Sequence, residues 1–292
     1  MHFLSLENIE LKKILKIVTF AIDLKKNFQK INDKFNNFMA ANIFLEPSTR
    51  TYTSFKIAEN KLGIKSVDFF KNNSSIEKNE SLFDTTETLK ALGFNLFVIR
   101  SEKNKYYEEL LKIKDISIIN AGDGNLDHPS QTILDLMTIY EHFGTFKDLN
   151  IAIIGDLNYS RVFLSNYKIF KRLKTNIFCV SIEEKISKLK VKNYKLSEII
   201  EKIDVFIFLR VQRERHKISI SNDYNDFFGL NEKNIKKIKD TAIILHPGPV
   251  NRDVEISSKV LDNDKRIKIL EQVKNGIFAR ITIFLYCLNK LT

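Results

Sequence analysis

Apolar positions along the chain follow two spacings in turn, and this alternation predicts interleaved helices and strands. Residues 11–24 have apolar side chains at positions 11, 14, 15, 18, 21 and 22, which is the spacing of one helix face. Short continuous apolar runs predict buried strands at 42–45, 96–100, 116–120, 150–155, 177–182, 205–210 and 241–246. Helices are predicted at 130–143, 162–173, 196–202 and 277–288, and another carries Phe55, Ala58 and Leu62 on one face.

This order of elements favours an α/β fold with parallel sheets covered by helices, because a strand that is followed by a helix usually returns parallel to its neighbour. A length of 292 residues favours two domains over one. In such sheets ligands bind beyond the carboxyl ends of the strands. The residues that follow predicted strands are therefore the candidates for a functional site.

The first candidate follows strand 42–45, where Ser48, Thr49, Arg50 and Thr51 open a helix. Free backbone N–H groups and the helix dipole favour an anion at this position, and hydroxyl and guanidinium groups would complete a phosphate-binding turn. An ordinary N-cap is the alternative, because Ser and Thr are common there. Arg50 is unfavourable to the helix dipole unless an anion compensates it, but the spacing alone leaves both interpretations open.

Basic side chains also follow other predicted strands. Arg100 and Arg210 each end an apolar strand, and Arg161 closes a strand–turn–helix segment that lacks the three glycines of a dinucleotide-binding motif. His128 follows a Gly-rich loop and precedes a helix, a position that would keep its imidazole neutral, although a structural histidine is the alternative. These residues together predict a site for negatively charged substrates that works by positioning and electrostatics.

Composition narrows the classes of protein. A net charge of +11 is compatible with nucleic-acid binding, but the lysines are scattered, and compositional drift towards Lys, Asn, Ile and Phe explains the charge better. Cys179 and Cys287 lie in apolar runs, as small buried residues of a reducing compartment do. No apolar run approaches the roughly 20 residues of a membrane span, and no signal peptide is apparent. We expect a cytoplasmic protein without nucleic-acid or membrane partners.

Several segments resemble motifs of the aspartate/ornithine carbamoyltransferase family. The segments are Ser48-Thr49-Arg50-Thr51, His128-Pro129-Ser130-Gln131, residues 210–215 and residues 246–252. The last two resemble the aspartate branch, since an ornithine enzyme would have a Trp-containing segment and a Cys after the His. This chain has no Trp, and Pro247 follows His246. The resemblance extends over the whole chain, from Leu4 to Arg280.

The resemblance implies two domains, each a parallel sheet with helices on both faces, and a C-terminal helix that returns to the first domain. Residues 1–132 with 277–292 would bind carbamoyl phosphate, and residues 133–276 would bind aspartate. The implied reaction transfers the carbamoyl group to the amine of L-aspartate, with no cofactor and no metal. An ornithine acceptor and a catalytically decayed scaffold are the alternatives.

The resemblance also implies a role for each matching residue. Phosphate would be bound by Ser48, Thr49, Arg50 and Thr51, and the carbonyl oxygen by Arg50, Thr51 and His128, with Arg100 and Gln131 also facing carbamoyl phosphate. The carboxylates of aspartate would be bound by Arg161 and Arg210, with Gln212 beside them, while the backbone of Pro247 and Gly248 meets the carbamoyl nitrogen and the amine. The bond between Gly248 and Pro249 is expected to be cis.

One segment of this chain resembles a family loop that contributes residues to the active site of a neighbouring subunit. Ser74 and Lys78 match the serine and lysine of a loop that enters the neighbouring protomer's site, so the resemblance implies a homotrimer with shared active sites and a catalytic role for Lys78. A regulatory chain or a dihydroorotase is a possible partner that the sequence does not indicate. The chain departs from the family at Tyr52, where a second arginine is usual, and at Asn79, where a glycine is usual.

Overall fold

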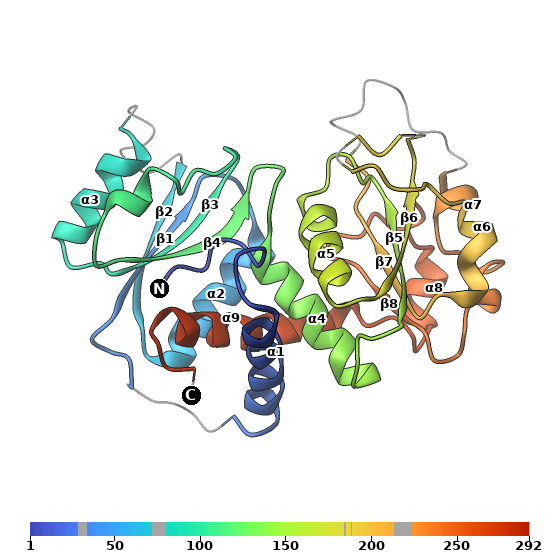
Figure 1. Ribbon diagram of the computed structural model, residues 1–292, viewed down its shortest axis with the longest axis horizontal. Coiled ribbons are helices and arrows are strands. Elements are labelled where there is room, and N and C mark those ends of the chain that lie inside the picture. The colour runs from blue at the N-terminus through green and yellow to red at the C-terminus, as the bar shows by residue number, and fades with distance from the viewer. Residues whose placement is uncertain (29–33, 72–79, 184, 188, 213–223, 292) are drawn as a thin grey trace. The chain divides into compact units, whose positions relative to one another are not determined.

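The computed structural model describes residues 1–28, 34–71, 80–183, 185–187, 189–212 and 224–291. The chain divides into two compact units, each with its own sheet (Figure 1). The first unit comprises Met1–Met137 and Val273–Thr292, and the second comprises Thr138–Gln272.

The sheet of the first unit is entirely parallel, with the described strands in the order β2-β1-β3-β4. The strands are β1 (Met39–Phe44), β2 (Lys65–Phe70), β3 (Leu96–Ser101) and β4 (Ser117–Asp123). The chain passes from β1 to β2 on one side of β1 and then crosses to β3 on its other side. The strand order therefore reverses between β1 and β3, which is the position where ligands of open α/β sheets bind.

Helices cover both faces of this sheet. They are α1 (Leu11–Lys26), α2 (Thr49–Leu62), α3 (Leu82–Ala91), the 3-10 helix η3 (Leu110–Lys112), the start of α4 (Pro129–Phe143) and most of α9 (Ile269–Cys287). Ile43 of β1 shares a buried cluster with Leu89 of α3. The next residue back along β1, Asn42, points to the opposite face because side chains alternate along a strand, and there it donates to Glu59 of α2.

The C-terminal helix α9 packs on α2 of the first unit. The rings of Phe55 and Phe284 lie 5.8 Å apart in an edge-to-face arrangement, and Arg280 stacks over the ring of Phe55 at 4.9 Å. The predicted return of the last helix to the first domain is thus confirmed. Its predicted start was wrong: α9 begins at Ile269, not at residue 277.

The sheet of the second unit repeats the same topology, with the described strands in the order β6-β5-β7-β8, all parallel. Its strands are β5 (Asn150–Gly155), β6 (Asn176–Ser181), β7 (Val205–Phe208) and β8 (Ile243–Leu245). The helical segments are α5 (Arg161–Arg172), α6 (Leu196–Ile199), η4 (Ile200–Lys202), α7 (Tyr224–Phe228), η6 (Ile235–Lys237) and α8 (Ser258–Asn263). Here the strand order reverses between β5 and β7.

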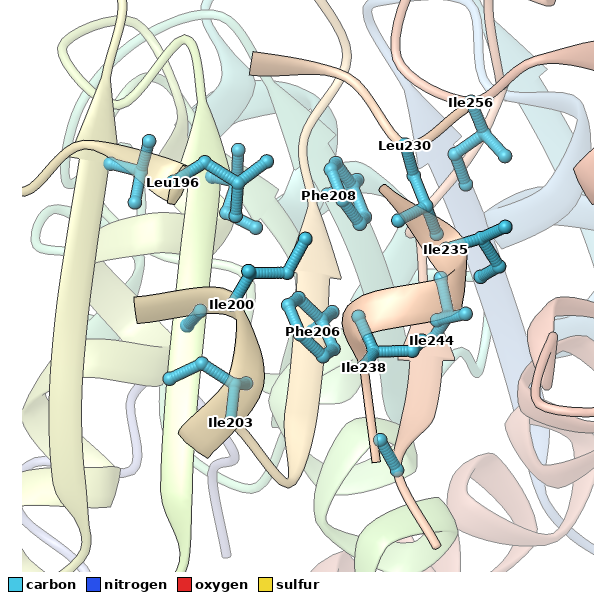
Figure 2. Close-up of a cluster of buried hydrophobic side chains, with 14 of the residues drawn as sticks. Leu196, Ile200, Ile203, Phe206, Phe208, Leu230, Ile235, Ile238, Ile244 and Ile256 are labelled. Atoms are coloured by element: carbon cyan, nitrogen blue, oxygen red, sulfur yellow. The ribbon is translucent and has the colours of Figure 1, made fainter. Parts of the chain in front are cut away.

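One face of this second sheet carries a large apolar core (Figure 2). The rings of Phe206 and Phe208 on β7 are stacked, with centroids 6.3 Å apart, and isoleucines from the neighbouring elements surround them. Burial of such side chains contributes about 1.5–3 kcal/mol each to folding. This core fixes the end of β7, from which residues 209–212 continue.

The predicted fold class is confirmed: two domains, each with a parallel sheet and helices. Each predicted strand is present in the described chain, with ends shifted by up to a few residues. The sequence pattern does not predict β2, α3, α7 or α8. None of the helices in the described part of the chain has both the length and the apolar character that a bilayer crossing demands.

Candidate active site

The turn between β1 and α2 presents the first candidate residues. Ser48 occupies the N-cap position of α2, but its side chain makes no capping hydrogen bond, and the first turn of α2 contains no acidic residue. Thr49 and Arg50 are exposed, whereas Thr51 is buried. The helix N-terminus thus keeps its favourable field for an anion, with a cation and hydroxyl groups beside it. This geometry favours the anion interpretation over the ordinary N-cap.

Arg100 connects three strand ends of the first unit. Its Nε lies 2.7 Å from a carboxylate oxygen of Glu46, which follows β1. Its Nη1 lies 3.5 Å from the hydroxyl of Thr51 and donates to the carbonyl oxygen of Ala121 in β4 at 3.3 Å. The same Nη1 lies 3.5 Å from Nε2 of His128. The structure therefore brings Thr51, Arg100 and His128 together at the reversal of strand order.

The imidazole of His128 faces a donor in this group. A guanidinium only donates hydrogen bonds, so its approach to Nε2 suits a neutral imidazole with a lone pair on that nitrogen. His128 immediately precedes α4, and both Gln131 and Thr132 donate backbone N–H bonds to its carbonyl oxygen. Gln131 is also buried in the first turn of α4, and its side chain donates to Asp135 at 2.9 Å.

The candidate residues of the second unit follow its strands at one edge of the sheet, because all strands there are parallel. Arg161 is the first residue of α5, which follows β5, and the hydroxyl of Ser160 caps this helix by accepting from the Phe163 N–H. Arg210 and Gln212 follow β7. Each of these three candidates is half-buried.

Two buried carboxylates hold the segment that carries Arg210 and Gln212. The backbone N–H of Gln212 donates to Asp156 at 3.1 Å, and the N–H of Val211 donates to Glu255 at 2.8 Å. Asp156 and Glu255 are both fully buried. Their carboxylates therefore hold the backbone of this segment in place through hydrogen bonds.

Gly155 permits the close approach of β5 to the segment after β7. A Cβ atom at this position would lie 2.8 Å from the carbonyl oxygen of Leu209, and its φ of +121° lies in the region that favours glycine. Asp156 follows directly. The glycine thus allows the Asp156 carboxylate to reach the N–H of Gln212.

Pro247 and Gly248 follow β8. The Gly248–Pro249 bond is cis, as expected from the sequence, and the Gly248 N–H donates to Nδ1 of His246 at 2.8 Å. The side chain of His246 is fully buried, with Nε2 3.6 Å from the carboxylate of Glu255. Sequence reasoning missed the roles of Asp156, Glu255 and His246. Of these three residues, only His246 lies in a segment that resembles a family motif at its strand end, whereas Glu255 follows that segment, between Val254 and Ile256.

Some predicted residues cannot be placed. Ser74, Lys78 and Asn79 lie outside the described residues, as do residues 213–215 of the 210–215 segment. Across the described ranges, no cluster of three or more His, Cys, Asp or Glu side chains could hold a metal ion.

The fold and the candidate site define a two-domain α/β protein with arginine, histidine and hydroxyl groups at the strand ends of parallel sheets. Residues 1–141 match the domain described as "Aspartate/ornithine carbamoyltransferase, carbamoyl-P binding domain", and residues 147–287 match its "Asp/Orn binding domain". The chain belongs to the aspartate/ornithine carbamoyltransferase family.

Curated relatives cover nearly the whole chain. An aspartate carbamoyltransferase catalytic subunit of Streptococcus agalactiae is 43% identical in an alignment of 298 positions that covers 99% of this chain and 96% of that protein. The catalytic subunit of Malacoplasma penetrans is 44% identical over 98% of this chain and 95% of its own length.

Solved structures are similar over the same extent. Aspartate transcarbamoylase from Trypanosoma cruzi in complex with carbamoyl phosphate superposes with a TM-score of 0.84 at 26% identity, covering 97% of this chain and 95% of that one. The catalytic subunit of the M. jannaschii enzyme gives a TM-score of 0.82 at 29% identity, with 99% and 98% covered.

Proposed function

We propose that the chain transfers the carbamoyl group of carbamoyl phosphate to the amine of L-aspartate. The products are N-carbamoyl-L-aspartate and phosphate, in a step of pyrimidine biosynthesis. The observation that carries this proposal is the group of Thr51, Arg100 and His128, which stands beside an uncapped helix N-terminus. Such a group suits a small substrate with a phosphate and a polarisable carbonyl.

The choice of aspartate as acceptor is supported by relatives and by motifs. Curated proteins that are 42–44% identical over nearly the whole chain are named aspartate carbamoyltransferase catalytic subunits. A Trypanosoma cruzi aspartate transcarbamoylase of similar fold is described in complex with carbamoyl aspartate and phosphate. Arg210 and the Pro247 that follows His246 match the aspartate branch of the family.

The first unit would bind carbamoyl phosphate. Its phosphate would accept hydrogen bonds from the first turn of α2, from Ser48, Thr49 and Thr51, with Arg50 and Arg100 offsetting the charge. As the aspartate amine attacks the carbamoyl carbon, negative charge develops on the carbonyl oxygen. Arg50, Thr51 and His128 would stabilise that charge in the manner of an oxyanion hole. Gln131 would face the same substrate.

The second unit would bind aspartate. Arg161 and Arg210 would each hold one carboxylate, because a guanidinium matches a carboxylate with two parallel hydrogen bonds. Gln212 would lie beside them. The backbone of Pro247 and Gly248 would meet the carbamoyl nitrogen and the amine. Fixing both carboxylates orients the amine and lowers the entropic part of the barrier.

The proposal also includes a homotrimeric assembly and a location in the cytoplasm. Ser74 and Lys78 would reach the neighbouring protomer's site in a homotrimer, as the resemblance implies. Cys179 and Cys287 are free and buried, which supports a reducing compartment such as the cytoplasm.

The proposal is tested by measuring ureido-product formation from carbamoyl phosphate, with aspartate and ornithine offered in parallel to the purified chain. We expect product with aspartate alone. Equal or greater product with ornithine would assign the chain to the ornithine branch. No product with either acceptor, from a folded and assembled protein, would identify a decayed scaffold. Both of these outcomes would overturn the proposal.

A further inference from the structure

Glu255 is a fully buried carboxylate with hydrogen bonds from two separate segments. Its Oε1 accepts from the backbone N–H of Val211 at 2.8 Å and from the side-chain amide of Asn251 at 2.8 Å. Its Oε2 accepts from the backbone N–H of Asn251 at 2.6 Å. A buried charge is costly unless it is bonded in this way, so these segments are strongly tied to the carboxylate.

Both tied segments carry proposed aspartate-binding residues. Val211 lies between Arg210 and Gln212, and Asn251 ends the segment that begins at Pro247 and Gly248. The side-chain amide of Asn251 also donates to the carbonyl oxygen of Val211 at 3.4 Å. A single carboxylate thus fixes the backbone after β7 against the backbone after β8.

His246 adds a second connection to the same carboxylate. Its Nδ1 accepts from the N–H of Gly248 at 2.8 Å, so the ring proton belongs on Nε2. That nitrogen lies 3.6 Å from Oε2 of Glu255, and both side chains are fully buried.

We propose that Glu255 is a positioning residue for aspartate, which holds Arg210 and Gln212 in register with Gly248 through Val211, Asn251 and His246. This inference rests on the proposed function. Glu255 is closed off from solvent, so it would act through the segments that it holds and not by binding aspartate itself. Its effect is preorganisation: two strand-end segments are held in one geometry before aspartate arrives, so less binding energy is lost in ordering them.

The test compares Glu255→Gln with the unaltered full-length chain. Glutamine keeps the volume, but its NH₂ group faces a backbone N–H where the carboxylate accepted a bond. We expect the KM for aspartate to rise about tenfold or more, which corresponds to about 1.4 kcal/mol. The Kd for carbamoyl phosphate, measured by calorimetry on the same preparation, should stay within about twofold. A substitution that merely loosened the whole fold would change both.

Asp262→Asn is the matched control. Asp262 forms an exposed ion pair with Arg252, the residue next to Asn251, with oxygen–nitrogen distances of 2.7 and 2.9 Å. Its substitution removes a carboxylate contact from the same segment without touching the buried one. We expect the KM for aspartate and the Kd for carbamoyl phosphate of this control to remain within about twofold of the values of the unaltered chain.

Asn251→Ala serves if Glu255→Gln does not fold. It removes only the side-chain amide bonds to Glu255 and Val211 and keeps the backbone bond. A rise of about threefold or more in the aspartate KM, with carbamoyl phosphate binding intact, would support the inference. Unchanged aspartate KM in both variants, or equal losses for both substrates, would overturn it. An unaltered chain without activity would instead contradict the proposed function.

Discussion

Glu59 is a buried acid on α2, the helix whose N-terminus forms the proposed phosphate site. It lies on α2 with a fully buried side chain, and its Oε2 accepts from the side-chain amide of Asn42 at 3.1 Å. The nearest cation, Nζ of Lys56, is 3.9 Å away. Burial raises the pKa of Glu59 to about 7, although hydrogen bonds from Ser66 and Asn42 and the charge of Lys56 act in the opposite direction. We predict that Glu59→Gln changes how stability depends on pH.

The size of the effect follows from the two pKa values. The pKa of Glu59 is about 7 in the folded chain, against an ordinary value of 4.5. At 1.36 kcal/mol per pKa unit, this difference corresponds to about 3 kcal/mol. Because the folded pKa is the higher one, the contribution to stability is fully present below pH 4.5 and is lost as pH rises through 7. The glutamine variant has no proton to lose and should lack this decline.

The assay is urea-induced unfolding of both proteins at several pH values between 4.5 and 8.5. As pH rises from 4.5 to 8.5, the unaltered chain should lose about 3 kcal/mol of free energy of unfolding that the Glu59→Gln variant keeps. Glu87→Gln, an exposed substitution on α3, is the control for the general effect of removing an acid. Parallel stability curves for the Glu59→Gln variant and the unaltered chain would refute the reasoning, because they would mean that the buried carboxyl titrates alike in both states.

Three further substitutions test the packing around the site by urea unfolding. Tyr52→Phe removes a 2.8 Å hydrogen bond to Asp68 and should cost about 1–2 kcal/mol, with a neutral result excluding a role in anchoring α2. Phe206→Ala should cost about 3–5 kcal/mol, because it empties the core of the second sheet. Gly155→Ala should cost at least about 1–3 kcal/mol from its positive φ, and its Cβ contact with Leu209 should also raise the aspartate KM.

The buried strands could be predicted because continuous apolar runs reveal them. β2 was not predicted because it is an edge strand whose residues are exposed or half-buried. Lys65 and Asp68 also interrupt its apolar run. The start of α9 was placed too late because Asn275 and Gly276 resemble a helix end in sequence. In the structure both continue the helix, and Asn275 is buried, where it accepts a hydrogen bond from Lys25 at 2.7 Å.

The sequence also limited what could be predicted of the site. Arginines at strand ends could be identified from the apolar runs that precede them, as with Arg100 and Arg210. The grouping of Arg100 with Thr51 and His128 depends on strand order, which the apolar pattern alone does not give. The sequence leaves the anion site and the N-cap at Ser48 both open, and the absence of a side-chain capping hydrogen bond at Ser48 supports the anion site.

The acidic residues are the part that sequence reasoning misses most, and one physical cause explains why. A site for anions loses affinity if carboxylates face it, so acids close to such a site have to be neutralised or turned away. Glu46 is paired with Arg100, while Asp156 and Glu255 are buried and bonded to backbone N–H groups. Sequence patterns treat an acid as a surface residue by default. An acid between two apolar residues, as Glu255 is between Val254 and Ile256, is therefore the signal to examine. Its burial requires hydrogen-bond donors, and the donors here belong to the segments that carry the proposed site.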